Sequence, residues 1–233
     1  MIIGGIQKNS FIDFPSKISC VLFTSGCNFD CPYCHNPELV RRTPTSKVID
    51  LKEIFDFLKK RKSLLDGVVI TGGEPTLHPD LFDFCLEIKG LGYPIKIDTN
   101  GSRPIVIQKL IDNHIVDYIA MDVKTSIERY SPVISKNCSP PDLKKSVLAI
   151  IQSGVAHEFR TTCVKSIVDA AEIEEISRLI SGASLYALQK FSMENNTVLH
   201  PDFFVAKDLR YGAQEMESFR AIASPFVKCA VIR

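Results

Sequence analysis

The sequence predicts a partial (β/α)6 barrel from three observations. Short apolar segments rich in β-branched residues alternate with segments of helical periodicity along the chain. Near-continuous apolar runs such as Val68-Val69-Ile70 indicate a parallel sheet covered by helices rather than a half-exposed sheet. Six such units can be counted, whereas a closed eight-unit barrel takes about 250 residues. Right-handed crossovers between the six strands would curve them into part of a barrel.

Six segments are predicted to form the strands of this barrel. Each is short and apolar, and turn-forming residues separate it from the next periodic segment. The segments are Lys17–Thr24, Gly67–Thr71, Pro94–Thr99, Asp117–Asp122, His157–Val164 and Ser184–Phe191. Residues 1–16 are expected to add a short N-terminal extension or hairpin. Residues from 192 onward are expected to form a polar, less regular C-terminal tail.

The segments between these strands predict amphipathic helices. Leu81, Phe84, Cys85 and Ile88 fall at positions i, i+3, i+4 and i+7, and Gly90 lies where that helix would end. The same stripe begins at Leu51, directly after Asp50, a residue suited to cap a helix. The remaining predicted helices are Pro104–Asn113, Pro141–Ser153, Asp169–Ser181 and, in the tail, Gln214–Ala223.

Composition indicates one globular domain over residues 1–233, with its core at about residues 17–191. The chain has 233 residues, of which 45% are hydrophobic and 24% charged, and a net charge of +1. So small a charge argues against a nucleic-acid-binding surface. No segment resembles a signal peptide or is long enough to span a bilayer, so no membrane partner is expected. Unpaired cysteines fit a reducing cytoplasm, the location that we expect.

Three closely spaced cysteines are the most informative feature of the chain. Cys27, Cys31 and Cys34 follow the pattern Cys-x3-Cys-x2-Cys, with no fourth cysteine nearby. Soft thiolate ligands select zinc, copper(I) or iron–sulfur clusters. Structural zinc sites and ordinary electron-transfer clusters use four protein ligands. Three thiolates on a four-iron cluster would leave one iron open to bind a small molecule.

Two other interpretations fit these cysteines less well. A structural zinc site would need His35 or a distant residue as its fourth ligand, and adjacent Cys34 and His35 are poorly placed to share one tetrahedral metal. A disulfide scaffold would be expected in a short, cysteine-dense secreted chain. The other cysteines are scattered singly and indicate no second cluster, and the sequence does not define a role for Cys138, which lies in a Ser/Pro/Asn-rich segment.

Polar residues follow several predicted strands at their carboxyl ends. Gly72-Gly73-Glu74-Pro75 follows the second strand, Asp98-Thr99-Asn100-Gly101 ends the third, and Asp122-Val123-Lys124 ends the fourth. Arg160 lies along the fifth strand. Because the carboxyl ends of parallel strands meet at one rim of a β/α fold, these residues are expected to lie near the cysteine loop.

These motifs resemble those of the radical S-adenosylmethionine superfamily. The resemblance rests on Cys27-x3-Cys31-x2-Cys34, the aromatic Tyr33 before the last cysteine, and Gly72-Gly73-Glu74-Pro75. A longer match covers Ser10-Phe11-Ile12-Asp13-Phe14-Pro15, Val21-Leu22-Phe23 and the segment from Gly26 to Pro37. It is similar to glycyl-radical-enzyme activating proteins, and most similar to those of anaerobic ribonucleoside-triphosphate reductase. The resemblance is strong over residues 10–37 and 68–76, and weak beyond Lys124.

The resemblance implies an oxidoreductase with a [4Fe–4S] cluster held by Cys27, Cys31 and Cys34. S-adenosylmethionine would bind the open iron, and its reductive cleavage would give a 5′-deoxyadenosyl radical. That radical would generate a glycyl radical on a partner, anaerobic ribonucleoside-triphosphate reductase, with reduced flavodoxin or ferredoxin as electron donor. The alternative is a radical enzyme acting on a small molecule or peptide, similar to 7-carboxy-7-deazaguanine synthase.

The resemblance also implies residues that bind S-adenosylmethionine. Gly72, Gly73 and Glu74 match the turn that binds its methionine moiety, and Lys124 matches a residue that contacts its carboxylate. Each has a simpler alternative, an ordinary strand-to-helix turn for the first three and a surface lysine for Lys124.

Five further residues are candidates for the same ligand. Tyr33 could stack on adenine or pack in the loop, and Asp98 and Asn100 could bind the ribose or amino group or form a solvated turn. Arg160 could pair with the ligand carboxylate or form a structural ion pair. Gln189 is a further candidate at the sixth strand.

Overall fold

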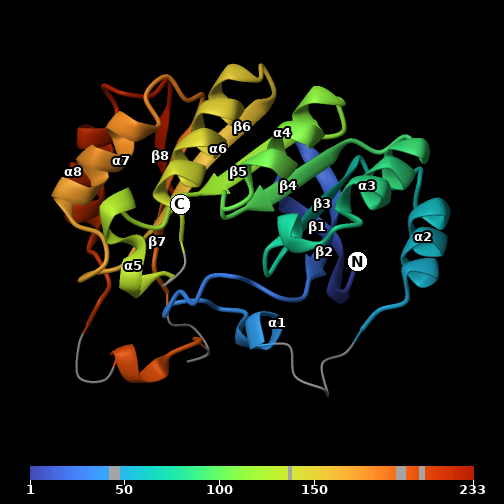
Figure 1. The fold of residues 1–233 in the computed structure, drawn as a ribbon, viewed down its shortest axis with the longest axis horizontal. Helices are drawn as coiled ribbons and strands as arrows, with labels where there is room; N and C mark the ends of the chain where they lie inside the picture. The colour runs from blue at the N-terminus through green and yellow to red at the C-terminus, as the bar shows by residue number, and fades with distance from the viewer. Residues whose placement is uncertain (42–47, 136–137, 193–197, 205–207) are drawn as a thin grey trace.

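One sheet of eight strands organises the chain. The computed structural model describes residues 1–41, 48–135, 138–192, 198–204 and 208–233. Within these residues the strands lie in the sequential order β1 to β8 (Figure 1). Strand β1 (Ile3–Phe14) pairs antiparallel with β2 (Lys17–Thr24), and each later strand is parallel to its neighbour. The predicted N-terminal extension is therefore the first strand of a hairpin.

The registers between neighbouring parallel strands bring their carboxyl ends to the same edge of the sheet. They continue as β3 (Gly67–Gly72), β4 (Ile95–Thr99), β5 (Tyr118–Asp122), β6 (Ala156–Cys163), β7 (Tyr186–Lys190) and β8 (Ala230–Ile232). Thr24 lies opposite Gly72, Thr99 opposite Met121, and Asp122 opposite Arg160. The loops that follow β2 to β6 consequently emerge at the same edge of the sheet.

Each long helix lies close to its predicted position. The helices are α1 (Pro37–Arg41), α2 (Leu51–Lys60), α3 (Leu81–Gly90), α4 (Pro104–Asp112), α5 (Tyr130–Val133), α6 (Pro140–Gln152), α7 (Ala170–Leu179) and α8 (Ala213–Ala223), with 3-10 turns η1 (Pro75–Leu77), η2 (Ile127–Arg129) and η3 (Pro201–Phe204). In α3 the apolar stripe is buried as predicted. Asp50 caps α2 by accepting a hydrogen bond from the Lys52 N–H at 2.9 Å.

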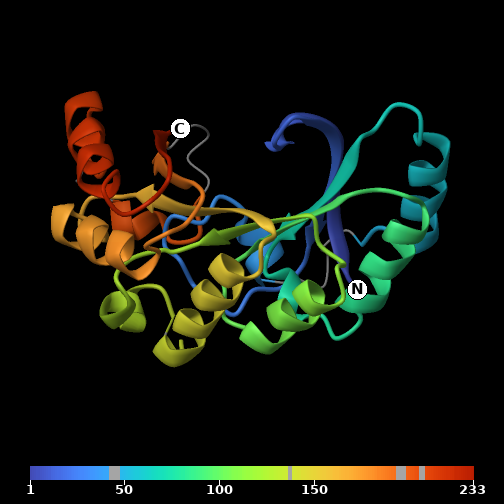
Figure 2. The ribbon, with the colours of Figure 1, turned by 90° about the horizontal axis from the view of Figure 1, so that it is seen from above.

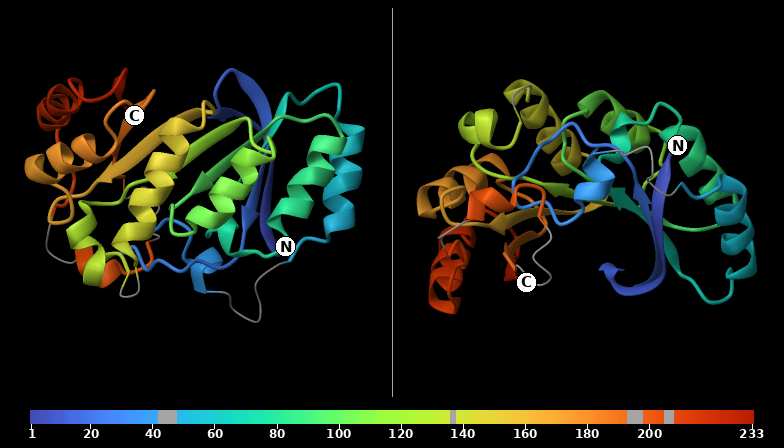
Figure 3. Two further views of the ribbon diagram at one scale, coloured as in Figure 1. Left: turned by 45° about the horizontal axis from the view of Figure 1, so that its top comes forward. Right: turned by 90° about the horizontal axis from the view of Figure 1, so that it is seen from below.

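The helices and the sheet form two layers. Helices α3, α4, α6 and α7 line the outer face of the curved sheet (Figures 2 and 3). The β1–β2 hairpin rises at one side of the inner face and α8 at the other. The main core lies between sheet and helices, whereas a small inner cluster joins Phe14, Val21 and Val69. The fold is thus a partial barrel that does not close.

The predicted fold class is confirmed, and the tail is more ordered than expected. After α8, strand β8 pairs in parallel with β7, with Ala187 opposite Val231. This strand has three residues, too few for a periodicity to appear in the sequence. The short helices α1 and α5 were missed for the same reason. Among the described residues, no helix has the length and apolar character needed to cross a membrane.

Candidate functional site

The three cysteines lie in the loop that follows β2. Gly26 enters this loop with φ of +98°, a conformation that favours glycine, and its N–H donates to the Leu39 carbonyl at 2.7 Å. Cys34 closes a tight turn by donating its N–H to the Cys31 carbonyl at 3.0 Å. All three cysteines are free, and all line one cavity of about 210 Å³.

Segments distant in sequence hold this loop from two sides. On one side the Asp30 N–H donates to the Ile134 carbonyl at 2.8 Å, and Phe29 meets Tyr130 edge-on. On the other side the Leu199 N–H donates to the Cys34 carbonyl at 2.9 Å. The second support comes from the region that the sequence analysis expected to be an irregular tail. Part of that tail therefore covers the cysteine loop.

The turn after β3 packs directly on the cysteine loop. Gly72 has φ of +113°, and a Cβ on Gly73 would lie 2.1 Å from the Gly26 carbonyl oxygen. Glu74 donates its N–H to that same oxygen at 2.8 Å. A side chain at Gly73 would therefore push the two loops apart. The predicted glycine turn is needed for close backbone approach, whatever ligand it binds.

The structure brings most of the predicted site residues to this one cavity. Its wall includes Cys27, Cys31, Tyr33, Cys34, Gly72, Gly73, Glu74, Asp98, Asn100 and Lys124. Arg160 and Gln189 are not part of this wall. The wall also contains Phe29, Thr99, Asp122 and Thr162, to which the sequence analysis gave no ligand role. Thr99 and Asp122 belong to the strand-end motifs that were expected near the cysteine loop, and Thr162 lies near the carboxyl end of the fifth predicted strand.

The donor set of the cavity fits an iron–sulfur cluster. Burial raises the pKa of Cys27 to about 11 and that of Cys31 to about 12, and it also raises the pKa of Cys34. Buried thiols of this kind become thiolates when a metal supplies positive charge. In the described residues, no three Cys, His, Asp or Glu side chains converge on the position of a single metal ion. Each thiolate of a four-iron cluster binds a different iron, so such convergence is not required.

Tyr33 gives a second indication that the cavity holds a ligand. Its hydroxyl is buried in the cavity wall and finds no hydrogen-bond partner among the described residues. A buried hydroxyl without a partner destabilises a protein by about 1–3 kcal/mol. A polar ligand in the cavity would supply the missing partner.

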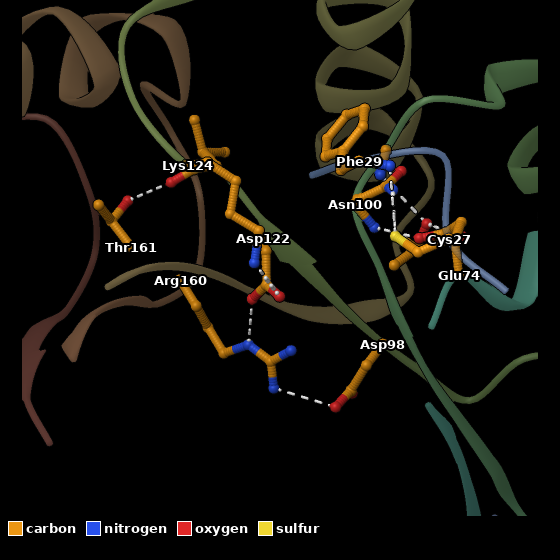
Figure 4. Close-up of polar contacts among 12 residues, drawn as sticks. Cys27, Phe29, Glu74, Asp98, Asn100, Asp122, Lys124, Arg160 and Thr161 are labelled. Atoms are coloured by element: carbon orange, nitrogen blue, oxygen red, sulfur yellow. Dashed lines mark hydrogen bonds and ion pairs between the residues drawn. The ribbon is translucent and has the colours of Figure 1, made fainter. Parts of the chain in front are cut away.

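A chain of alternating charges borders the cavity along β4, β5 and β6 (Figure 4). Arg160 donates from Nε to Asp122 at 2.7 Å and from Nη1 to Asp98 at 3.1 Å. Asp122 also accepts from Lys124 Nζ at 2.9 Å, and Asp98 pairs with the buried Lys96. The Arg160 guanidinium is therefore engaged by protein carboxylates, which favours the structural ion pair over direct contact with a ligand.

The charged groups in this row of ion pairs shift one another's pKa values. Burial alone would raise the pKa of Asp122, but Arg160 and Lys124 outweigh it and hold that pKa well below its usual range. Burial alone would lower the pKa of Lys124, but the neighbouring Asp122 carboxylate outweighs it and raises that pKa. Lys124 thus presents a permanent positive charge at the cavity wall, suited to a ligand carboxylate.

Comparison with known sequences places the chain in a family. The model of the radical SAM superfamily matches residues 21–180. A protein of Methanocaldococcus jannaschii named "putative glycyl-radical enzyme activating enzyme" is 38% identical over 198 residues, which cover 82% of this chain and 80% of that protein. A pyruvate formate-lyase-activating enzyme of Listeria monocytogenes is 29% identical over 150 residues, 59% of each chain.

Solved structures share the fold. Streptococcus suis SuiB bound to S-adenosylmethionine matches 91% of this chain and 51% of its own, with a TM-score of 0.66 and 14% identity. Methylornithine synthase matches 91% of this chain and 63% of its own, with a TM-score of 0.65 and 15% identity. The chain spans about half the length of SuiB. Radical SAM enzymes use a [4Fe–4S] cluster and S-adenosylmethionine. The chain belongs to the radical SAM superfamily, as an enzyme of the glycyl-radical enzyme activating group.

Proposed function

We propose that this enzyme generates a glycyl radical on anaerobic ribonucleoside-triphosphate reductase. The observation that carries the proposal is one cavity lined by three free cysteines, the Gly72-Gly73 turn and the Lys124 ammonium. Relatives named as activating enzymes support the reaction class. The similarity of residues 10–37 to activating proteins of this reductase supports the choice of partner.

Different residues of the cavity would bind the cluster and the parts of S-adenosylmethionine. Cys27, Cys31 and Cys34 would hold the cluster, and backbone groups of Gly72 and Gly73 would meet the methionine moiety of S-adenosylmethionine. Lys124 would pair with the carboxylate of that ligand, while Asp122 and Arg160 hold Lys124 in place. When bound, the cluster and S-adenosylmethionine supply a carbon radical that removes one hydrogen atom from the partner's glycine Cα.

Exclusion of water is the other task of the protein. Phe29 and Tyr33 are 3% and 4% exposed, and they place apolar surface beside the cysteines. Phe191 packs against Tyr33, with ring centroids 6.5 Å apart, and stacks on Phe204 at 5.1 Å. This aromatic group, together with the Leu199–Cys34 hydrogen bond, shields the side of the loop away from α5. A radical formed there would be protected from solvent.

The enzyme requires an external electron donor. We infer reduced flavodoxin or ferredoxin, because the reaction consumes one electron that the described side chains do not supply. We also infer a cytoplasmic location, in keeping with unpaired cysteines and a site built for a reduced cluster.

Electron paramagnetic resonance tests the proposal directly. The protein is reconstituted anaerobically with iron and sulfide, and then mixed with reductant, S-adenosylmethionine and anaerobic ribonucleoside-triphosphate reductase. We expect a glycyl radical signal on the reductase and release of 5′-deoxyadenosine. A Cys31→Ala variant should give neither, and a Cys229→Ala variant, which alters an exposed cysteine, should give both.

Other outcomes would separate the competing functions. Formation of 5′-deoxyadenosine without a glycyl radical on the reductase would overturn the proposed partner while leaving the superfamily unaffected. A deazapurine product would favour an enzyme similar to 7-carboxy-7-deazaguanine synthase. Zinc without iron or sulfide in anaerobically purified protein would indicate a structural zinc module instead.

A further inference from the structure

Hydrogen bonds within the protein hold the carboxylate of Glu74, a residue of the turn that the sequence predicts to bind the ligand. Its Oε1 accepts from the Thr76 N–H at 3.0 Å, from the Thr76 hydroxyl, and from the Thr99 hydroxyl at 2.8 Å. Its Oε2 accepts from the Asn100 N–H at 2.6 Å. The side chain is 0% exposed, and both carboxylate oxygens accept hydrogen bonds from within the protein. Glu74 therefore joins the ends of β3 and β4.

The strand end that Glu74 holds carries the Asn100 side chain toward Cys27. Asn100 Nδ2 lies 3.9 Å from Cys27 Sγ and donates to Asn28 Oδ1 at 3.0 Å (Figure 4). The orientation of the amide follows from its other end. There Oδ1 accepts from the Ser102 N–H at 3.0 Å, so the amide nitrogen must face the sulfur.

Cys27 Sγ thus receives two N–H groups. The Phe29 N–H points at the sulfur at 3.4 Å. The amide of Asn100, which directly follows β4, approaches from a position 73 residues away from Cys27 in sequence. The Phe29 contact comes from the loop itself, whereas the Asn100 contact depends on the Glu74 carboxylate that fixes β4. A thiolate would strengthen both contacts, because a charged acceptor makes stronger hydrogen bonds than a neutral one.

We propose that Asn100 is a positioning residue that raises the reduction potential of the cluster through Cys27, and that Glu74 holds it there. Reduction adds negative charge to the cluster and its sulfur ligands. An N–H donor at a ligand sulfur stabilises that charge and makes the cluster easier to reduce. The inference rests on the proposed function, which makes Cys27 a cluster ligand.

Measurement of the reduction potential tests the inference apart from activity. The reconstituted enzyme, without S-adenosylmethionine, is poised at a series of potentials, and the reduced cluster is quantified by electron paramagnetic resonance. We expect Asn100→Ala to shift the midpoint to a more negative value at wild-type iron content. Glu74→Gln should shift it in the same direction by less. Asn113→Ala removes an amide that contacts the Lys109 carbonyl on α4 and should leave the midpoint unchanged.

The outcomes distinguish this inference from the proposed function. An unchanged midpoint in Asn100→Ala at full iron content would overturn the role of Asn100 and leave the activase proposal intact. A Cys27→Ala variant that keeps the wild-type cluster spectrum would overturn the ligand assignment, and this inference with it. If Asn100→Ala takes up no iron, Asn100→Ser, which keeps a polar residue in the turn but cannot reach the sulfur, decides by the same midpoint criterion.

Discussion

Two carboxylates in the cavity wall, Glu74 and Asp122, are stabilised in different ways. Glu74 accepts hydrogen bonds from neutral donors alone, and burial raises its pKa despite them. Asp122 lies between the cations of Arg160 and Lys124, and its pKa is lowered even though burial opposes this. Neutral donors can therefore satisfy the geometry of a buried carboxylate without offsetting its desolvation, whereas paired cations do both.

The contacts around these two carboxylates also serve different purposes. The Glu74 side is a short-range brace between two strand ends and the cysteine loop, and its members make no ion pair in the described structure. The Arg160 side is a line of alternating charges across three strands, and it ends in Lys124 at the cavity wall. Three substitutions and one change of pH test this difference.

Removal of the central cation should have the largest effect. Arg160→Met leaves Asp98 and Asp122 with one lysine each. Loss of one partner destabilises a protein by about 3–5 kcal/mol when the ion pair is fully buried, so this is the upper bound for these partly buried pairs. Urea unfolding of the metal-free protein at neutral pH measures this loss. Arg178→Met is the matched control, because its pair with Glu174 is exposed and contributes about 0–1 kcal/mol. Equal losses in the two variants would show that the charge chain is not structurally important.

Neutralising the brace should have a smaller effect. Glu74→Gln keeps the shape of the side chain but turns an amide N–H₂ toward a backbone N–H of Thr76 or Asn100, leaving a buried donor unpaired. A loss of about 1–3 kcal/mol in the free energy of unfolding is expected by the same measurement. Glu217→Gln, in an exposed pair with Arg220, should change stability little. A loss as large as that of Arg160→Met would erase the distinction between the two networks.

Lys124 should matter for the ligand more than for the fold. Lys124→Met leaves Asp122 paired with Arg160 but removes the cation from the cavity wall. We expect a rise on the order of 10-fold in the KM for S-adenosylmethionine, since a charge-assisted hydrogen bond contributes about 1.5–3 kcal/mol. Partner-free release of 5′-deoxyadenosine gives this KM. The same assay on Lys165→Met, whose partner Glu215 lies in the C-terminal region, should show the wild-type value.

A change of pH near neutrality should have the smallest effect on stability. The pKa of Asp122 is lowered in the folded state, so its contribution to stability is full above the ordinary carboxylate pKa of about 3.9. It is lost as pH falls toward the lowered value. The difference in unfolding free energy between wild type and Asp122→Asn should stay constant from about pH 8 to 5 and shrink below about pH 4. A difference that already shrinks between pH 7 and 5 would contradict the lowered pKa.

Much of this arrangement follows from local sequence. The predicted strands and long helices appear near their predicted bounds, because apolar periodicity and caps such as Asp50 act within one or two turns of chain. The cysteine spacing and the Gly72-Gly73 turn can likewise be recognised from a few consecutive residues. Parallel strands then bring their carboxyl ends to one edge, so the common cavity could be anticipated from the order of elements alone.

The uses of individual side chains could not be anticipated in this way. The Arg160 guanidinium, predicted either to bind the ligand or to form an ion pair, is engaged by Asp98 and Asp122. The Glu74 side chain, for which the sequence indicated no partner, is engaged by Thr99 and Asn100. Those partners lie 25 to 62 residues away in sequence. No local sequence pattern indicates contacts between residues so far apart.

The family, the cysteine ligand set that we propose and the order of the predicted strands follow from local sequence, since each depends on residue type and short spacing. Three other features depend on the tertiary structure and could not be predicted from local sequence. It added β8 to the sheet, laid the segment that contains Leu199 over the cysteine loop, and turned Glu74 inward to brace Asn100. The physical reason is that packing and hydrogen bonding between distant segments select among contacts that local sequence leaves equally open.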